Sequence, residues 1–275
     1  MTLPFLDPGS LSVAEAADAI EAALAGGLDP ESGPPRTVLG VGEGDLLVMP
    51  AAVGSVAAVK LVSVGPNEPR VQGVCVLFDA ASLAPVALID GISLTNLRTP
   101  AVSVVAVRRL AAPEARRLVV FGRGPQAEAH AAALRAERPI TDVSFLGRGD
   151  DPSAVAGADI VCCCTTAREP LFDGALVADH ACVVAIGSHE PLVRETDDRL
   201  AARATVVVES RSSALREAGD VIAAVEAGVL DPDSLITLRD LVRGADVPPG
   251  PRLFKSTGMA WEDAVVAAAL YDRGI

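Results

Sequence analysis

The chain has 275 residues, half of them apolar, which is enough for two modest domains with a substantial core. Its formal charge of −13 argues against a nucleic-acid partner, because binding a phosphate backbone requires a basic face. The N-terminal residues lack the pattern of a signal peptide and no apolar run approaches the roughly 20 residues that cross a bilayer, so we expect a cytoplasmic protein that does not enter a membrane.

The first part of the chain predicts an α+β domain. Residues 12–26 have the apolar spacing of an amphipathic helix, and a segment rich in glycine and proline follows them. From Ile92 to Leu110 the spacing is helical again, and Pro113 ends this helix. Between the two helices we predict five strands, near residues 36–41, 45–50, 56–64, 71–79 and 84–89.

Strands that are apolar on both faces dominate the second part. They are separated by helical or loop segments and read RLVVFG, DVSFLG, ADIVCCCTT, ACVVAIGS and ATVVVES. Such runs are typical of a parallel sheet covered on both sides. We predict further helices near 213–228 and 233–243, a short strand at RLFKS and a last helix ending at Tyr271. The predicted fold class is therefore α/β, with a Rossmann-type doubly wound parallel sheet beside the α+β domain.

Five cysteines, three of them adjacent at residues 162–164, show no CxxC spacing. An odd count favours reduced thiols over a disulfide framework. We interpret the triplet as small apolar residues of a buried strand and predict no metal site; a reactive thiol or a metal site is the alternative.

The stretch VVFGRGPQAEAH, residues 119–130, carries a glycine motif between a strand and a helix. In this setting Gly122 allows a tight turn, and Gly124 lets backbone N–H groups approach a pyrophosphate at the start of a helix near Pro125. Ala127 takes the place of the third glycine, and an ordinary structural turn is the alternative. The motif predicts a dinucleotide held by Gly122, Gly124, Pro125, Gln126 and Ala127.

The end of the next strand decides between the two nicotinamide dinucleotides. An acidic residue there would hold the ribose 2′-hydroxyl of NAD. The sequence instead has Leu146 and Gly147 followed by Arg148, whose guanidinium would suit a 2′-phosphate. This favours NADP(H) over NAD(H), although a surface arginine with Asp150 or Asp151 turned inward would reverse the preference.

Lys60 and Lys255 are the only lysines of the chain. Lys60 lies in an otherwise apolar strand, where its charge requires a ligand, a partner or a position at the sheet edge. Arg98 lies early in an apolar helix beside Thr95 and Thr99, and these donors suit a carboxylate, unless the arginine pairs with a nearby aspartate.

These segments, in this order, resemble the ornithine cyclodeaminase/mu-crystallin family. The matching segments are PPR at 34–36, MPA at 49–51, VK at 59–60, LTNLRTPA at 94–101, GRGPQA at 122–127, ADIV at 158–161, AIGS at 185–188, RE at 194–195, and FKSTG with Asp263 at 254–263.

The resemblance implies a homodimer with two domains per chain. Residues 1–112 with 250–275 would form the α+β substrate-binding and dimerisation domain, and residues 113–249 the Rossmann domain. A carboxylate-bearing small molecule would lie among Arg36, Lys60 and Arg98.

The resemblance also implies further roles. Lys60 would act in proton transfer, or stabilise charge, while a C=N bond is reduced or formed. Thr99, Thr165 and Ser256 complete the predicted cofactor-binding set.

One position departs from the cyclodeaminases of this family. Counting back from Glu195, their amine-handling aspartate aligns with His189, and an imidazole cannot replace a carboxylate that offsets an ammonium charge. Ketimine reductases lack that aspartate too, because their substrate arrives as an imine. His189 would then donate a proton to the imine nitrogen or shape the pocket as a loop residue; a register shift of one would bring Glu190 there instead.

We therefore predict an enzyme: an NADPH-dependent reductase that acts on the C=N bond of a small imine with a carboxylate, cyclic or open, and yields an amino acid. The alternatives are an NAD(P)-dependent amino-acid dehydrogenase or cyclodeaminase, and a non-catalytic protein that binds NADPH and a small ligand.

Overall fold

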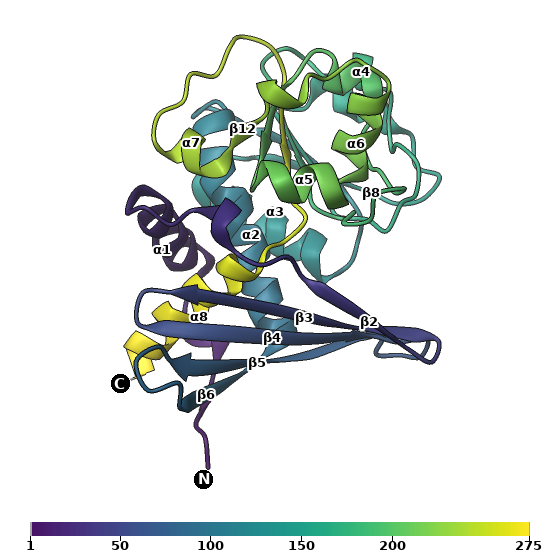
Figure 1. The fold of residues 1–275 in the computed structure, drawn as a ribbon. Helices are drawn as coiled ribbons and strands as arrows, with labels where there is room; N and C mark the ends of the chain where they lie inside the picture. Colours follow the sequence, from purple (N-terminus) through teal and green to yellow (C-terminus); the bar gives the residue numbers. More distant parts are fainter. Residues whose placement is uncertain (1, 275) are drawn as a thin grey trace. The chain divides into compact units, whose positions relative to one another are not determined.

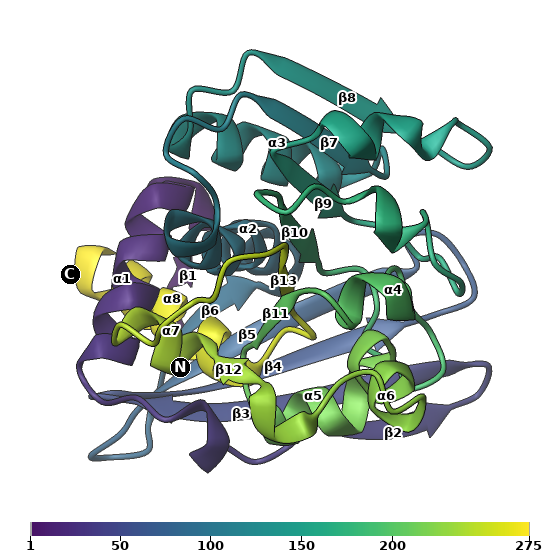
Figure 2. The same cartoon turned by 90° about the horizontal axis from the view of Figure 1, so that it is seen from above.

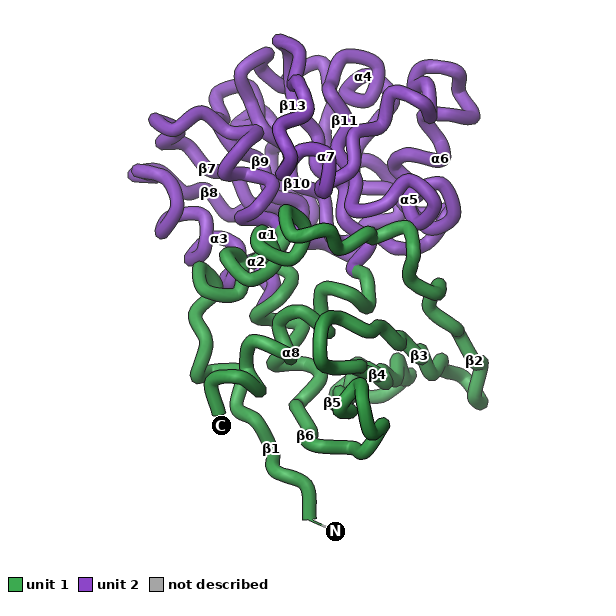
Figure 3. Tube along the Cα trace, turned by 60° about the vertical axis from the view of Figure 1, so that its left-hand side comes forward, with its two compact units in different colours: residues 1–102, 259–275 green, residues 103–258 purple. Residues whose placement is uncertain are grey.

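The computed structural model describes residues 2–274 (Figure 1). The chain forms two compact units, residues 1–102 with 259–275 and residues 103–258 (Figure 3). None of the helices within the described residues has both the length and the apolar character that a bilayer crossing requires.

The first unit is built on a six-stranded sheet in the order β1-β6-β5-β4-β3-β2. β1 runs parallel to β6, and the other neighbours are antiparallel. Gly42 and Gly54, with φ of 61° and 58°, turn the chain between the strands of the two hairpins β2-β3 and β3-β4. The strands are β1 (Phe5–Leu6), β2 (Thr37–Val41), β3 (Gly44–Val53), β4 (Val56–Val64), β5 (Val71–Asp79) and β6 (Pro85–Asp90).

Helices cover one face of this sheet. α8 (Ala260–Gly274) packs on β3 and β4 and also contacts α1 (Val13–Ala25). A capping box at Ser12 and Glu15 starts α1. The long helix α2 (Gly91–Leu110) follows β6 directly, and the short 3₁₀ turns are η1 (Pro8–Ser10) and η2 (Pro30–Ser32).

The second unit is built on a seven-stranded sheet in which every pairing is parallel, in the order β12-β11-β13-β10-β9-β7-β8. β8 and β9 lie on opposite sides of β7, so the strand order reverses there, and α3 packs beside β7 and β9 (Figure 2). The strands are β7 (Arg117–Phe121), β8 (Asp142–Leu146), β9 (Ile160–Cys163), β10 (Cys182–Ala185), β11 (Thr205–Val208), β12 (Ile236–Thr237) and β13 (Arg252–Lys255).

The helical segments of this unit are mostly short. They are α3 (Pro125–Glu137), α4 (Asp198–Ala201), α5 (Arg211–Glu217), α6 (Gly219–Glu226) and α7 (Leu238–Val242), with 3₁₀ turns η3 (Pro152–Gly157), η4 (Gly174–Leu176) and η5 (Pro232–Ser234). The predicted helix at 213–228 is thus two helices that meet at Ala218, and most of the segment predicted as helical at 233–243 is η5, β12 and α7.

The predicted fold class, a Rossmann-type parallel sheet with a second α+β domain, is confirmed. The limits of the compact units differ from the predicted domain boundaries. They fall at 102/103 and 258/259, where the sequence pattern placed them at 112/113 and 249/250. The first difference arises because α2 is one helix whose residues belong to both units; the second arises because β13 pairs with β10 and β11, a non-local pairing that local sequence does not reveal.

Candidate functional site

The turn after β7 has a backbone that only glycine can adopt without strain. Gly122 has φ of 112°, and a Cβ on it would lie 2.4 Å from the carbonyl oxygen of Cys164. Its N–H donates to the oxygen of Leu146 at 2.9 Å. Gly122 therefore lets the carboxyl ends of β7, β8 and β9 come together at the point where the strand order reverses, which is where doubly wound sheets bind ligands.

The start of α3 is open to an anion. Gly124 is its N-cap residue and makes no side-chain capping hydrogen bond, and Pro125 occupies the first turn. A Cβ on Gly124 would meet nothing within 4 Å, whereas Ala127 is fully buried and packs beneath the turn. Backbone N–H groups without a side-chain cap, at the positive end of a helix, suit a phosphate.

A pocket of about 980 Å³ lies beside this turn. It is lined by residues 121–124 at the end of β7, 146–150 at the end of β8 and 164–171 after β9. Gly122, Gly124, Arg148 and Thr165 of the predicted cofactor set line it. Pro125, Gln126 and Ala127 form the adjoining first turn of α3.

Two arginines and one aspartate stand at the β8 side of this pocket. Asp150 accepts hydrogen bonds from the N–H of Gly147 at 2.7 Å and from Arg123 Nη2 at 2.9 Å. Both hydrogen bonds hold the pKa of Asp150 below its usual value, and the bond from the backbone of Gly147 has the larger effect. Arg148 is exposed and makes no ion pair within residues 2–274. Sequence reasoning missed Arg123, which is the variable position between the two glycines.

Thr165 is fixed by a buried carboxylate. Glu195 accepts hydrogen bonds from the N–H and hydroxyl of Thr165 at 2.9 and 2.7 Å, and from the N–H of Gly187 at 2.8 Å. Burial raises the pKa of Glu195, against the effect of Lys255. Glu195 therefore ties together the segments that follow β9 and β10.

A second buried group supports the loop after β10. Lys255 Nζ donates to the oxygen of Ser188 at 2.7 Å and lies 3.4 Å from Asp220, which accepts from Ser188 Oγ and from the N–H of Glu195. Burial opposes ionisation of Asp220, but Lys255 and the hydrogen bonds outweigh it, so its pKa is lowered. Lys255 thus has a structural role in the described chain.

Two predicted residues of this unit lie outside the pocket lining. Ser256 is buried, and its hydroxyl donates to Glu209 at 2.5 Å. His189 is exposed on the loop that follows β10. The cofactor role predicted for Ser256 and the catalytic role predicted for His189 stay predictions.

In the first unit, Lys60 and Arg98 share one carboxylate. Lys60 Nζ lies 2.8 Å from Asp263 and 3.3 Å from Thr95 Oγ1. Arg98 Nε donates to Asp263 Oδ1 at 3.2 Å, and its Nη1 donates to Glu262 Oε2 at 2.7 Å. All four charged side chains are buried, so two cations are balanced by two carboxylates away from water.

This environment changes the proton affinity of Lys60. Burial lowers the pKa of its ammonium below the usual 10.5, Asp263 opposes this effect, and the charge of Arg98 adds to it. Cys75 is the cross-strand neighbour of Lys60 on β5, and burial raises its pKa to about 12. A buried lysine with a lowered pKa is a candidate for proton transfer.

Close backbone contact positions the start of α2. A Cβ on Gly91 would lie 2.7 Å from the backbone of Gly73 in β5, and Asp90 caps the helix by accepting from the N–H of Ser93 at 2.7 Å. The first three turns then carry Thr95, Arg98 and Thr99. Thr99 is buried and belongs to this unit, so its predicted cofactor contact stays a prediction.

Arg36 precedes β2 by one residue and is partly buried. Thr37 pairs with Val48 and Met49 pairs with Lys60, so Arg36 lies two strands from Lys60 along one cross-strand row. Its side chain therefore belongs to the same region of the sheet, about 10 Å away at the backbone.

In the sequence analysis, Asp263 is named only as part of a segment that matches the family, without a role, and Glu262 is not identified. Two adjacent acidic residues in the first turn of a last, mostly apolar helix were the signal that could have found them.

Comparison with known proteins extends these observations. The sequence model of the ornithine cyclodeaminase/mu-crystallin family matches residues 9–152 and 148–275. Mouse ketimine reductase mu-crystallin is 32% identical over 287 residues, which cover 92% of this chain and 90% of that protein.

Solved structures agree in fold. The Δ(1)-pyrroline-2-carboxylate reductase of Thermococcus litoralis, in complex with NADH and L-proline, has a TM-score of 0.89 at 26% identity and covers 99% of this chain and 97% of its own. An archaeal alanine dehydrogenase dimer with bound NAD has a TM-score of 0.87 at 25% identity, with coverage of 100% and 96%. The resemblance seen in the sequence is thereby confirmed: the chain belongs to the ornithine cyclodeaminase/mu-crystallin family.

Proposed function

We propose that this protein is an NADPH-dependent reductase of small carboxylate-bearing imines, cyclic or open, which it converts to amino acids. The observation that carries the proposal is Lys60, a buried lysine of lowered pKa held by Asp263. The names of the mouse relative and of the Thermococcus structure, both imine reductases, support the same chemistry.

The residues around the pocket of the second unit fit a nicotinamide dinucleotide. The backbone N–H groups at the start of α3 would take the pyrophosphate, and Gly122 and Gly124 keep that space clear. When bound, the reduced nicotinamide supplies a hydride to the imine carbon. Thr165, Thr99 and Ser256 remain our candidates for further contacts with the cofactor.

We propose NADP(H) in preference to NAD(H). Arg123 and Arg148 both line the pocket at the end of β8, and two guanidinium groups suit a 2′-phosphate. Asp150 is the competing feature, because a carboxylate here could accept a bond from a ribose hydroxyl. Its ion pair with Arg123 and its bond from Gly147 occupy one of its oxygens, Oδ2.

On the substrate side, Arg36 and Arg98 are the candidates for binding the carboxylate. Arg98 already contacts Glu262 and Asp263, so a substrate carboxylate would share its guanidinium with them. Lys60 would supply the proton that the amine product requires, and Asp263 would hold Lys60 in place. His189 is the candidate for a second proton donor.

We further propose a homodimer. Val38, Leu39 and Val41 of the edge strand β2 are 56–59% exposed, and apolar side chains on an open sheet edge favour association. The archaeal alanine dehydrogenase of this fold is described as a dimer.

The deciding experiment follows oxidation of NADPH and NADH at the nicotinamide absorbance with a cyclic ketimine carboxylate, piperideine-2-carboxylate. Turnover with a preference for NADPH is the expected result. Ammonia release from an L-amino acid without imine reduction would instead identify a dehydrogenase or cyclodeaminase. NADPH binding without either reaction would indicate a ligand-binding protein.

A further inference from the structure

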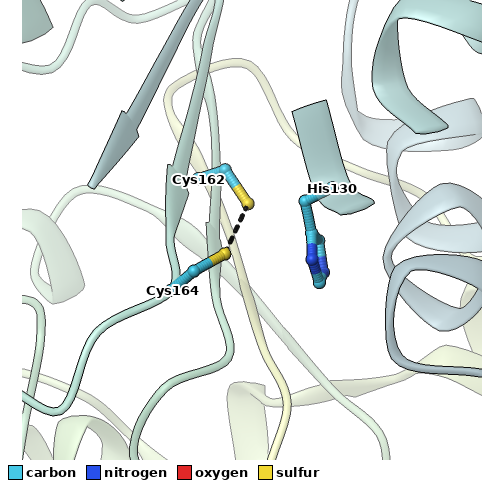
Figure 4. A group of neighbouring side chains, drawn as sticks. All are labelled: His130, Cys162 and Cys164. Carbon is cyan, nitrogen blue, oxygen red and sulfur yellow. Dashed lines mark hydrogen bonds between the residues drawn. The ribbon is translucent and has the colours of Figure 1, made fainter. Parts of the chain in front are cut away.

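Two thiols and an imidazole meet at the end of β9, outside the groups that the proposed reaction uses (Figure 4). The sulfurs of Cys162 and Cys164 are 3.5 Å apart, because residues two apart in an extended segment point to the same side. A ring nitrogen of His130, from α3, lies within 4.8 Å of both sulfurs. Cys163 alternates to the opposite side and packs into the hydrophobic core with Val161.

His130 is held as a metal-binding histidine usually is. It is fully buried, and its Nδ1 lies 2.7 Å from the backbone oxygen of Gln126. A carbonyl oxygen only accepts, so Nδ1 carries the hydrogen and Nε2 carries the lone pair. Ser103 Oγ is 2.9 Å from Nε2, so its hydroxyl donates a hydrogen bond to this lone pair, and a bound ion must replace that hydrogen bond.

The spacing of the two sulfurs fits a shared metal ion better than a disulfide. Zinc binds cysteine sulfur at about 2.3 Å, which at a tetrahedral angle separates two sulfurs by roughly 3.8 Å. Residues two apart in an extended segment have Cα atoms about 6.6 Å apart, at the far limit of what a disulfide spans. A metal ion therefore requires only small side-chain shifts, whereas a disulfide would form at the upper limit of its usual Cα separation.

We propose that Cys162, Cys164 and His130 bind a thiophilic divalent cation of the zinc class. Both sulfurs bind the ion as thiolates, so binding releases the protons that the two sulfurs still carry, and the two thiolates balance the charge of the ion. Three protein ligands leave a fourth position open, as in zinc sites that exchange a ligand.

The location of the site couples it to the pocket of the second unit. Cys164 is half-buried and lines that pocket, and its carbonyl oxygen lies against Gly122. An ion on Cys164 therefore occupies space beside the glycine turn, so metal and dinucleotide compete. The competition rests on the proposed function, whereas metal binding does not.

The first test titrates the whole, tag-free and reduced protein with Zn²⁺ and with Co²⁺, whose thiolate charge-transfer absorption reports sulfur ligands. One ion per chain with that absorption is expected, with at least about a hundredfold weaker affinity in Cys162→Ala and in His130→Gln. Cys182→Ala removes a buried thiol of the neighbouring strand β10 and is the matched control, expected to bind as the wild type does. Thermal unfolding checks that each variant is folded.

Absence of a stoichiometric Co²⁺ complex, or equal affinity in wild type, Cys162→Ala and Cys182→Ala, would overturn the site. The second test measures NADPH affinity by fluorescence with and without Zn²⁺. Zn²⁺ should raise the apparent Kd for NADPH in the wild type and not in Cys162→Ala. Simultaneous binding without competition overturns the coupling. Zn²⁺ binding without any NADPH binding overturns the proposed function and leaves the metal site standing.

Discussion

Lys60 and Lys255 are both almost wholly buried, yet their partners give them different roles. Lys60 faces the carboxylate of Asp263 beside a second cation, Arg98, and burial together with the charge of Arg98 lowers the pKa of its amine. Lys255 donates to backbone oxygens of the loop after β10 and supports its shape. The scarcity of lysine in the sequence drew attention to both residues, and only their contacts in the structure distinguish the role of one from that of the other.

Replacing Lys60 by methionine should lower kcat for imine reduction by at least about a hundredfold, because the proton donor is lost. NADPH affinity should stay within about twofold, since the dinucleotide pocket belongs to the other unit. Steady-state kinetics and NADPH fluorescence measure the two effects. Retained turnover would show that Lys60 is only structural, and lost NADPH affinity would show that the variant is misfolded.

The rate of imine reduction should fall as pH rises through the pKa of Lys60, because the protonated amine is the active form. Burial places this pKa below 10.5, so the loss begins at lower pH than for an exposed lysine. A kcat profile over alkaline pH measures it. A profile that stays flat up to pH 10.5 would contradict the assignment; Lys60→Arg, which stays charged, should lack the alkaline limb if it retains activity.

Replacing Arg148 by alanine should raise the KM for NADPH by about 10- to 100-fold and leave that for NADH nearly unchanged, because only NADPH has the 2′-phosphate. Arg199, an exposed arginine of α4 that pairs with Asp173, provides the control variant Arg199→Ala. Equal changes for both cofactors would remove the argument for NADPH.

At the scale of elements, the strand ends of the parallel sheet determine what the pocket can hold. β7, β8 and β9 each end at the pocket, and the glycine turn lets α3 begin there with its N–H groups uncapped by a side chain. The same alternation that buries Cys163 in the core sets Cys162 and Cys164 on the side of α3. Short sequence motifs predicted these elements well because turn, strand and helix are local.

The two glycines of the turn should respond differently to alanine. Gly122→Ala should lower stability by at least about 2 kcal/mol, since its φ is positive and a Cβ meets the oxygen of Cys164. Gly124→Ala should change stability by less than about 1 kcal/mol and still weaken NADPH binding, because its Cβ enters only the open space. Thermal unfolding and NADPH titration compare them. Unchanged NADPH affinity in Gly124→Ala would contradict a pyrophosphate at this turn.

At the scale of the whole molecule, the chain leaves the first unit in α2 and returns to it before α8. The acid pair that holds Lys60 and Arg98 is therefore supplied by the last helix, more than 160 residues away in sequence. The first unit needs both ends of the chain to complete its charged cluster. We expect that removing α8 abolishes folding of that unit.

A dimer through β2 predicts that Leu39→Asp shifts the protein from dimer to monomer, because an exposed charge opposes burial of the strand. Sedimentation velocity measures the mass, and Leu83→Asp, an exposed leucine outside β2, serves as control. A wild-type monomer, or a Leu39→Asp variant that remains dimeric, would contradict this interface.

The sequence by itself determined most of the elements, the fold class, the family and the glycine turn, because each depends on local patterns of apolar residues, glycine and proline. Only the tertiary structure decided the partners of the charged groups. The pairing of Lys60 with Asp263, the bonds of Glu195 to Thr165 and the position of β13 between β10 and β11 all join residues far apart in the chain. Such contacts follow from how strands and helices pack, and no local pattern records them.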